Sequence, residues 1–361
     1  MKLAHGGRPP ASTKRQHRGR RIKQISATLF LGVGAMMLSS CSAEEVMRFG
    51  WPEGITPEAE SMRHLWTWSV IAALVMGIIV WALTFWTITF HRKKPGGDEF
   101  PRQTAYNVPL ELTYTAIPFV IIAVLFYFTI IVQNDVEAKK SDPDVVVNVT
   151  AFQWNWKFGY RTVQLEDGSR YDGTRENPYE NQRAELEEHA GEKAEQAGHN
   201  EQNAIDAERN NIREYLMYDK IETTGNSEEI PVLVLPTGKR IEFEIASNDV
   251  VHSFWVPEFL FKRDVFPFPE ENHTDNRFQV SSIDREGAFV GRCAEMCGTY
   301  HSMMNFEVRA VSPEEFDRYI KFRDSNPNAT NAQALESIGE PATALTTKPF
   351  DTRRGTQTAS N

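Results

Sequence analysis

The sequence Cys293-Ala-Glu-Met-Cys297-Gly-Thr-Tyr-His301-Ser-Met-Met304 places two thiols, an imidazole and a thioether within twelve residues. Soft sulfur ligands with one imidazole suit copper, zinc or an iron–sulfur cluster, and they do not suit magnesium or calcium. Zinc sites usually join a close Cys pair to a second pair or to two nearby histidines, and neither follows here. Haem attachment would require Cys-x-x-Cys-His, which is absent. The methionine at the end of the stretch favours copper.

Cysteine is scarce in the rest of the chain, because the only other one is Cys41. No disulfide framework can therefore form. Two alternatives to a metal site remain for Cys293 and Cys297: they are buried thiols beside a core methionine, or they pair as one disulfide. The histidine and the methionine beside them favour the metal.

A single mononuclear blue-copper site needs one Cys, two His and a weak axial ligand, so it would leave one thiolate unused. Two coppers bridged by both thiolates would each need one imidazole and one weak ligand. His301 is the local imidazole, and His252 at a predicted strand end is the better second candidate. His273 is the alternative, but it lies in a polar turn where a solvated side chain is expected. Met304 supplies one weak ligand, and a backbone carbonyl is available as the other.

The chain has 361 residues and a formal net charge of −10, but its charge is unevenly placed. Residues 1–40 carry eight basic residues and no acidic ones, so the rest of the chain is strongly acidic. An acidic protein attracts basic partners, and we expect no nucleic-acid binding.

The N-terminus has the layout of a secretory signal peptide over residues 1–40, with a basic start and an apolar run too short to span a bilayer. It ends in Leu38-Ser-Ser-Cys41-Ser, which resembles a bacterial lipobox, where the Cys is lipidated and becomes the mature N-terminus. The alternative is ordinary cleavage near Ser42, with Cys41 incidental. In both cases residues 41–64 are exported.

Two apolar runs follow. Leu65–Phe90 has about 26 residues without a charge, which is long enough for a transmembrane helix. The basic sequence His91-Arg-Lys-Lys94 comes next and marks the cytoplasmic side. The second run, Pro109–Val132, then returns to the outside. We expect a two-helix transmembrane hairpin over 65–134 with a short cytoplasmic loop.

Glu111 lies at the cytoplasmic start of the second run. A carboxylate near a membrane end often only reaches back to water, whereas an intramembrane carboxylate is a candidate for a proton path. The residues alone leave both interpretations open.

The exported domain, 135–323, is rich in β-branched and aromatic residues with partial alternation, which predicts a β-sandwich. The predicted strands lie within Val145–Tyr160, Val232–Ile245, Ser253–Val256, Gly287–Val290 and Asn305–Val311. The sequence Ser312-Pro-Glu-Glu315 is a helix start, and the helix should run to about Arg323. Residues 324–361 are rich in Asn, Thr, Ala and Pro, so we expect them to be disordered.

An insert at about 161–230 interrupts the strands with 18 acidic and 8 basic residues. Its middle, about 181–218, has a composition that favours helix. A segment of this length is usually functional or disordered, and a solvated insertion without a partner is the alternative.

The metal-binding residues sit in a wider pattern that resembles subunit II of cytochrome c oxidase. The motifs that carry the resemblance are Asp249-Val-Val-His252-Ser-Phe-Trp-Val-Pro257, the stretch from Cys293 to Met304, Gln153-Trp154-Asn-Trp156 and Pro109-Leu-Glu111-Leu-Thr-Tyr-Thr-Ala-Ile-Pro118. Together they cover about residues 60–160 and 230–323. The resemblance implies a mainly β, exported cupredoxin-like sandwich after an N-terminal two-helix transmembrane hairpin.

The resemblance also implies a dinuclear copper centre, called CuA, with a defined ligand set. The ligands would be His252, Cys293, Glu295, Cys297, His301 and Met304. In this family the two thiolates bridge two copper ions, and each imidazole binds one. The methionine is a weak ligand to one copper and the carbonyl of Glu295 to the other. The Glu295 side chain would reach a magnesium ion at the boundary with subunit I.

The same resemblance implies the reaction. Trp154 would receive electrons from cytochrome c or from a membrane-bound c-type cytochrome of a bc complex, and acidic residues such as Asp249 would help to dock it. Glu111 would lie at the mouth of a proton channel into subunit I. Electrons would pass from CuA to haem in subunit I, which also holds CuB, and would reduce oxygen to water with proton pumping. This chain would not reduce oxygen alone.

The implied location is the bacterial cell membrane, with both termini and the copper domain outside and with subunits I and III as partners. Three competing classes are a copper-delivery protein, a quinol oxidase subunit II that lacks the copper ligands, and a membrane anchor. The chain departs from the family at Tyr114, where Trp is usual, in the 161–230 insert, and after His252 at 259–269.

Overall fold

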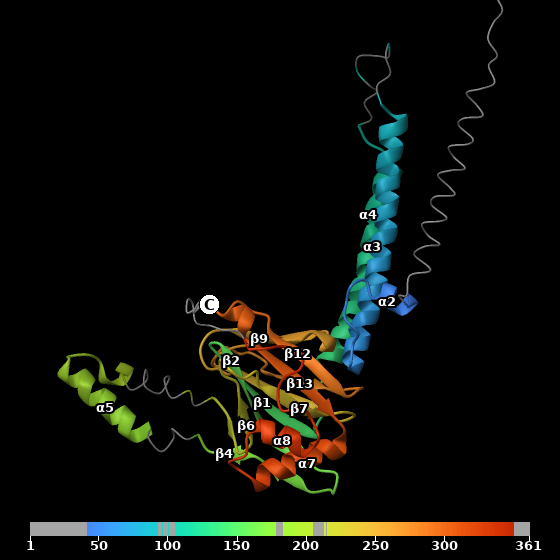
Figure 1. Ribbon diagram of the computed structural model, residues 1–361. Helices are drawn as coiled ribbons and strands as arrows, with labels where there is room; N and C mark the ends of the chain where they lie inside the picture. Colours follow the sequence, from blue (N-terminus) through green and yellow to red (C-terminus); the bar gives the residue numbers. More distant parts are fainter. Residues whose placement is uncertain are drawn as a thin grey trace, which may run out of the picture. The chain divides into compact units, whose positions relative to one another are not determined.

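The computed structural model (Figure 1) describes residues 42–92, 96, 100, 105–177, 183–204, 213 and 215–349. These residues divide between two compact units, with the boundary between Gly50 and Trp51. In the first unit the short helix α2, Ala43–Met47, begins at a Ser42 cap. The predicted signal peptide and Cys41 lie outside the described residues.

Two long helices open the second unit and pack side by side (Figure 1): α3, Pro57–Phe90, and α4, Val108–Val136. Both are long and apolar enough to cross a membrane, and none of their most apolar windows is buried. α3 begins eight residues before the predicted start, because the Thr56 side chain accepts a hydrogen bond from the Ala59 backbone and Pro57 fits the first turn.

The β-domain consists of two main sheets. The first has the order β11-β8-β1-β2-β3, with β6 also paired to β2, and the second has the order β10-β9-β12-β13-β7. The first contains β1 Val145–Phe152, β2 Asn155–Gln164, β3 Arg170–Asp172, β6 Glu222–Thr224, β8 Ile241–Ser247 and β11 Arg277–Val280. The second contains β7 Val232–Pro236, β9 His252–Val256, β10 Phe261–Val265, β12 Gly287–Cys293 and β13 Asn305–Val311. The pairs β1–β8 and β7–β13 are parallel, and the other main-sheet pairs are antiparallel.

The core lies between these sheets and combines aliphatic side chains with aromatic rings. Along β8 the alternation buries Ile241, Phe243 and Ile245 and turns the acidic residues between them away, as the two-residue period of a strand requires. Phe254 from β9 stacks on Phe306 from β13 with ring centroids 4.8 Å apart. The strands β9 and β13, which flank the metal motif, are therefore anchored in the core by aromatic contacts.

The segment before α3 also belongs to this core. Ile55 is 1% exposed, its N–H donates to the Glu258 carbonyl at 3.0 Å, and its carbonyl accepts from the Asp284 N–H at 2.9 Å. The segment before the hairpin is therefore more than a flank of the two helices, because it contributes a side chain to the sandwich.

The acidic insert is shorter than predicted. β2 runs to Gln164, and β3 and β6 pair with it, so both ends of the predicted insert are sheet. A small two-stranded sheet closes the base of the insert; it pairs β4, Thr174–Arg175, with β5, Tyr218–Asp219. Within the insert, α5, Arg183–Gln196, is the predicted helix. The prediction of helix up to residue 218 is wrong at its end, because Tyr218 lies in strand β5 and pairs with Arg175 in β4.

The prediction of disorder from residue 324 is also wrong over much of that segment. α7, Pro313–Ser325, starts at the predicted Ser312–Glu315 capping box, and a second helix, α8 Asn331–Ser337, follows. Thr330 and the helix residue Gln333 form another capping box, and the side chains of Ala334 and Leu335 are fully buried. The polar composition of this segment predicted disorder, but a few buried apolar side chains hold it against the domain. Residues 350–361 lie outside the described part.

Candidate metal centre

The sulfur and imidazole side chains meet at one end of the second sheet. His252 begins β9 and Cys293 ends β12, and these two strands are neighbours in the sheet. Cys297 and His301 lie in the loop that follows, and Met304 ends this loop immediately before β13. A hydrogen bond of 3.1 Å from the Cys293 N–H to the Met304 carbonyl closes the loop at its base.

Each thiol has its own imidazole. The two sulfur atoms of Cys293 and Cys297 are 3.8 Å apart. The His252 Nδ1 lies 3.8 Å from the Cys293 sulfur, and the His301 Nδ1 lies 3.5 Å from the Cys297 sulfur. A disulfide bond is about 2.05 Å long, so both cysteines are free thiols and the disulfide alternative is wrong.

Each thiol also has a weaker donor. The Met304 sulfur lies 3.9 Å from the Cys297 sulfur, and the Glu295 carbonyl oxygen lies 3.3 Å from the Cys293 sulfur. The six predicted ligand residues are therefore brought together, with one thiol, one imidazole and one weak donor in each half. Such a soft, paired donor set fits two copper ions that share both sulfurs.

The centre is almost closed to solvent. His252 is fully buried, and Cys293, Cys297 and Met304 are 8%, 3% and 1% exposed. Burial without a partner would be costly for an imidazole, and Asp249 supplies that partner. Its carboxylate Oδ1 lies 2.8 Å from the His252 Nε2, and its Oδ2 accepts the Gln153 N–H at 2.8 Å. With the Nε2 proton held by the carboxylate, the Nδ1 that faces the sulfur carries the free lone pair.

These contacts shift the acid–base properties of the site. Burial favours the neutral thiol, but hydrogen bonds with His252 and with the backbone of Glu295 and Ser253 together lower the pKa of Cys293 to about 7. Burial and the adjacent Cys293 charge raise the pKa of Cys297 to about 12. Burial lowers the pKa of His252, but the hydrogen bonds and charges of Asp249 and Cys293 together outweigh burial, so the pKa is raised. The two thiols therefore have unequal surroundings, which lower the pKa of Cys293 and raise that of Cys297.

Trp154 touches the metal loop from outside. Its indole Nε1 donates to the Cys297 carbonyl at 3.1 Å, and the Gln153 side-chain amide donates to the same oxygen at 2.7 Å. Its ring meets the Tyr300 ring edge-on with centroids 4.9 Å apart. Gly298 has a φ of +122°, and a Cβ there would lie 3.1 Å from the indole, so glycine allows this close approach.

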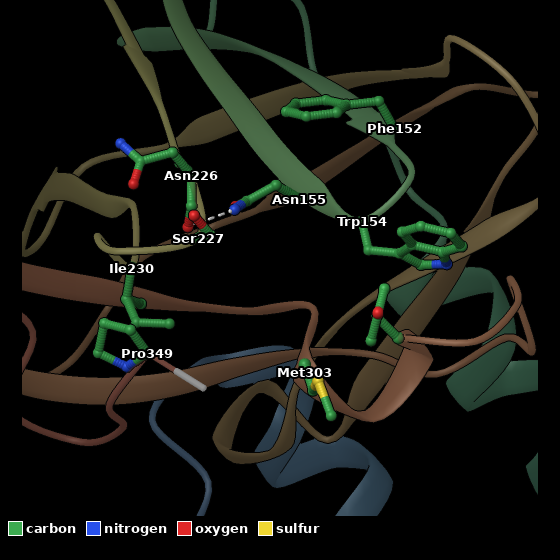
Figure 2. Close-up of a pocket in the computed structure, with 10 residues that line it drawn as sticks. Phe152, Trp154, Asn155, Asn226, Ser227, Ile230, Met303 and Pro349 are labelled. Carbon is green, nitrogen blue, oxygen red and sulfur yellow. Dashed lines mark hydrogen bonds between the residues drawn. The ribbon is translucent and has the colours of Figure 1, made fainter. Parts of the chain in front are cut away.

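A pocket of about 360 Å³ lies beside this tryptophan. In Figure 2 Trp154 stands at its right, Met303 below, and Ile230 and Pro349 at its left. Asn155 closes another side through a hydrogen bond of 3.0 Å from its amide to the Asn226 carbonyl. The pocket therefore joins the surface at Trp154 to the loop that carries the ligands.

The sequence prediction missed several residues that support the centre. Buried Trp156 donates from its indole Nε1 to the Met304 carbonyl at 3.3 Å. Gln153 shares the Cys297 carbonyl with Trp154, and Tyr300 packs edge-on against the Trp154 ring. Asp249 was predicted only as a docking residue, yet both its carboxylate oxygens are hydrogen-bonded within the domain. Its position three residues before a candidate histidine was a usable signal for a hydrogen-bond partner.

Glu111 does not belong to this site. Its carboxylate accepts the Asn107 N–H at 2.9 Å, and the Asn107 side chain accepts the Leu110 N–H at 3.2 Å. The pair caps the start of α4, so the carboxylate has a local structural role.

The similarity of this chain to known proteins shows which family it belongs to. The family described as "Cytochrome C oxidase subunit II, periplasmic domain" matches residues 213–311. The "Probable cytochrome c oxidase subunit 2" of Nocardia farcinica is 59% identical over 348 residues, which cover 96% of this chain and 92% of that protein. The chain belongs to the cytochrome c oxidase subunit 2 family. Relatives of the same name in Mycobacterium bovis and Corynebacterium diphtheriae are 53% and 50% identical, over 93% and 92% of this chain and 91% and 93% of theirs.

Membership in the cytochrome c oxidase subunit 2 family confirms the resemblance predicted from the motifs, and it makes the chain a subunit of cytochrome c oxidase. A solved structure similar to this chain is the periplasmic domain of subunit II of cytochrome oxidase (CoxB) of Bradyrhizobium japonicum. It is 20% identical, with a TM-score of 0.29, and the match covers 51% of this chain and 96% of that one. The predicted fold class, a mainly β domain after two apolar helices, is confirmed.

Proposed function

We propose that this chain accepts electrons from a c-type cytochrome at a dinuclear CuA centre and passes them to haem in subunit I. There oxygen would be reduced to water with proton pumping. The observation that carries the proposal is the paired arrangement of donors: two thiols 3.8 Å apart, each with its own imidazole within 3.8 Å. A mononuclear site would use only half of this set.

The six residues that would hold the coppers are His252, Cys293, Glu295 through its carbonyl, Cys297, His301 and Met304. When bound, copper at these residues would supply one-electron transfer, accepting an electron and then releasing it. The chain's own contribution is rigidity, because β9 and β12 fix one imidazole and one thiol and Asp249 holds the imidazole in orientation. A site that does not move when its charge changes favours rapid electron transfer.

Trp154 is proposed as the point where electrons arrive. Its indole is hydrogen-bonded to the carbonyl of the ligand residue Cys297, so a short bonded path connects the surface to the centre. The donor would be a cytochrome c or a membrane-bound c-type cytochrome, and the acidic charge of the chain suits a basic docking face.

Other roles follow from the resemblance and stand as proposals. The Glu295 side chain would bind magnesium at the boundary with subunit I, and Glu111 would lie at a proton-channel mouth in addition to capping α4. The copper domain and both termini would face outside, with subunits I and III as neighbours. Cys41 would be lipidated, which the mass of the mature N-terminal peptide would test.

The copper proposal is tested with residues 143–361 expressed as a soluble domain, loaded with copper and examined by electron paramagnetic resonance. One unpaired electron shared by two equivalent coppers is the expected signal. A signal from a single copper, or a preference for zinc, would contradict a dinuclear centre and would favour a copper-delivery role.

A further inference from the structure

The strand that follows the metal loop carries two buried charges that the copper site does not use. On β13, Phe306 and Val308 face the core, while Glu307 and Arg309 point to the opposite face of the sheet. Glu307 is nevertheless fully buried and Arg309 is 2% exposed. Charged side chains are almost never this buried unless they are paired and hydrogen-bonded. Something must therefore cover this face.

The cover is residues 340–349, which we call the C-terminal strap. Glu307 Oε2 accepts hydrogen bonds from the N–H groups of Leu345 and Thr346, at 2.6 and 2.8 Å, and from the Thr346 hydroxyl at 2.8 Å. Its other oxygen, Oε1, accepts from the Arg309 guanidinium. The carboxylate is therefore saturated, and most of its partners are strap atoms.

Arg309 fixes the first half of the strap in the same way. Its guanidinium donates to the Glu340 carboxylate at 2.8 Å, to the Pro341 carbonyl at 3.3 Å and to the Thr343 carbonyl at 3.2 Å. Most of these contacts are to backbone groups of the strap. Glu307 and Arg309 therefore fix the path of the strap backbone and depend little on which side chains the strap carries.

The strap leads to the pocket beside Trp154. Pro349, at its end, lines that pocket together with Trp154, Tyr300 and Met303 (Figure 2). The last residues of the acidic insert, up to Ile230, line it as well. Two segments that lie outside the simple sandwich therefore meet where the electron is proposed to arrive.

We propose that the C-terminal strap is part of the docking face for the protein electron donor and helps to determine which donor is accepted. The inference rests on the proposed function, because it takes Trp154 as the point where electrons arrive. Glu307 and Arg309 are positioning residues, because they act only through the strap.

The charges near the pocket indicate a basic donor. Glu228 and Glu229 are exposed next to the lining residue Ser227, and the chain as a whole is acidic. Lys348, exposed beside Pro349, is a basic residue on the strap. Leu345 on the strap is 61% exposed, and an apolar side chain of this kind is common in protein contacts. Lys348 opposes a basic donor and so limits its affinity.

The first test is Lys348→Glu in the assembled oxidase, assayed with a soluble basic c-type cytochrome as donor. At low ionic strength KM should fall about two- to fivefold, at high ionic strength the effect should vanish, and kcat should not change. The matched control is Arg318→Glu on α7, which is 57% exposed and lines no part of the pocket. An unchanged KM, or an equal fall in the control, would overturn the inference.

The second test is Glu307→Gln, which places an amide N–H group among the N–H groups of the strap. The strap should become sensitive to protease and KM should rise about threefold or more, with the copper spectrum unchanged. A released strap with an unchanged KM would overturn the inference. If this variant fails to assemble, Lys348→Glu decides alone.

Trp154→Ala tests the proposed electron entry point separately from the role of the strap. If it leaves transfer from the donor intact, the proposed point of arrival is wrong. If it stops transfer while Lys348→Glu and a released strap leave KM unchanged, only the role of the strap is wrong.

Discussion

Replacing Asp249 by Asn keeps the shape of the side chain and removes its charge. The carboxylate accepts three hydrogen bonds, each 2.8 Å long, from the His252 Nε2, the Val250 N–H and the Gln153 N–H. An amide has only one acceptor oxygen, so at least one of these donors loses its partner. Hydrogen bonds to a charged group contribute about 1.5–3 kcal/mol each.

The expected loss of unfolding free energy is about 1–3 kcal/mol, because one such bond is lost and the side chain is only 26% exposed. The reduction potential should rise as well, because an imidazole without its carboxylate partner is a weaker base and stabilises the oxidised metal less. A difference of about 1–2 kcal/mol between the two oxidation states corresponds to about 40–90 mV for one electron.

The assays are urea unfolding and an optical redox titration of the copper-loaded domain. The matched control is Asp264→Asn on β10, whose carboxylate is 39% exposed and bonds to Lys262 at 3.3 Å. An unchanged potential in Asp249→Asn, with the copper signal intact, would refute the idea that the carboxylate tunes the ligand. A change in donor KM that disappears at high salt would show that Asp249 also takes part in docking.

Three further predictions concern the ligands and the core around them. Cys297→Ser should abolish the dinuclear copper signal, whereas Met304→Leu should keep it and shift its potential; paramagnetic resonance separates the two, and equal effects would contradict the assignment of strong and weak ligands. Gly291→Ala should cost about 2–3 kcal/mol in urea unfolding, because its Cβ would lie 2.1 Å from the buried Phe306 ring; a neutral result would mean that the ring can move. Burial raises the pKa of Asp219, so the folded state retains its proton to higher pH than the unfolded state, and stability falls as pH rises from the ordinary Asp pKa through the raised one. Asp219→Asn should flatten this fall in unfolding measurements across the acidic range, and an unchanged slope would assign it to other groups.

The metal centre was largely predictable because most of its chemistry is local in sequence. Cys293, Cys297, His301 and Met304 lie on one loop, and His252 was selected from the remaining histidines by its place at a strand end. Its hydrogen-bond partner was not predicted as such, since a carboxylate three residues away could equally face water.

Helix ends were predicted less well than helix existence. Counting apolar residues gave Leu65 as the start of the first span, but the helix begins at Pro57. Hydrophobicity locates the part that lies in the bilayer, whereas the Thr56 side chain sets where the backbone hydrogen bonds begin.

The ordered segment after α7 was missed for a different reason. Its composition is polar, and composition alone predicts disorder. The local signal was present, since Thr330 and Gln333 have the spacing of a capping box. The buried pair of Glu307 and Arg309 gave no such signal, because their partners lie more than thirty residues further along the chain.

The distance along the chain between β13 and its partners in the strap has a consequence for biosynthesis. β13 precedes its partners in residues 340–346 along the chain, so the contacts of its two charges with the strap form only after this later segment has folded onto the sheet. Without residues 340–349 this face of β13 is open to water, and the hydrogen bonds from Glu307 and Arg309 to the strap are lost. Hydrogen bonds to charged groups contribute about 1.5–3 kcal/mol each, so the loss of several is comparable to the whole stability of many domains. A chain that stops before residue 340 would therefore hold its final strand poorly, and with it the loop that ends at Met304. Copper insertion would thus be reserved for chains translated past this point.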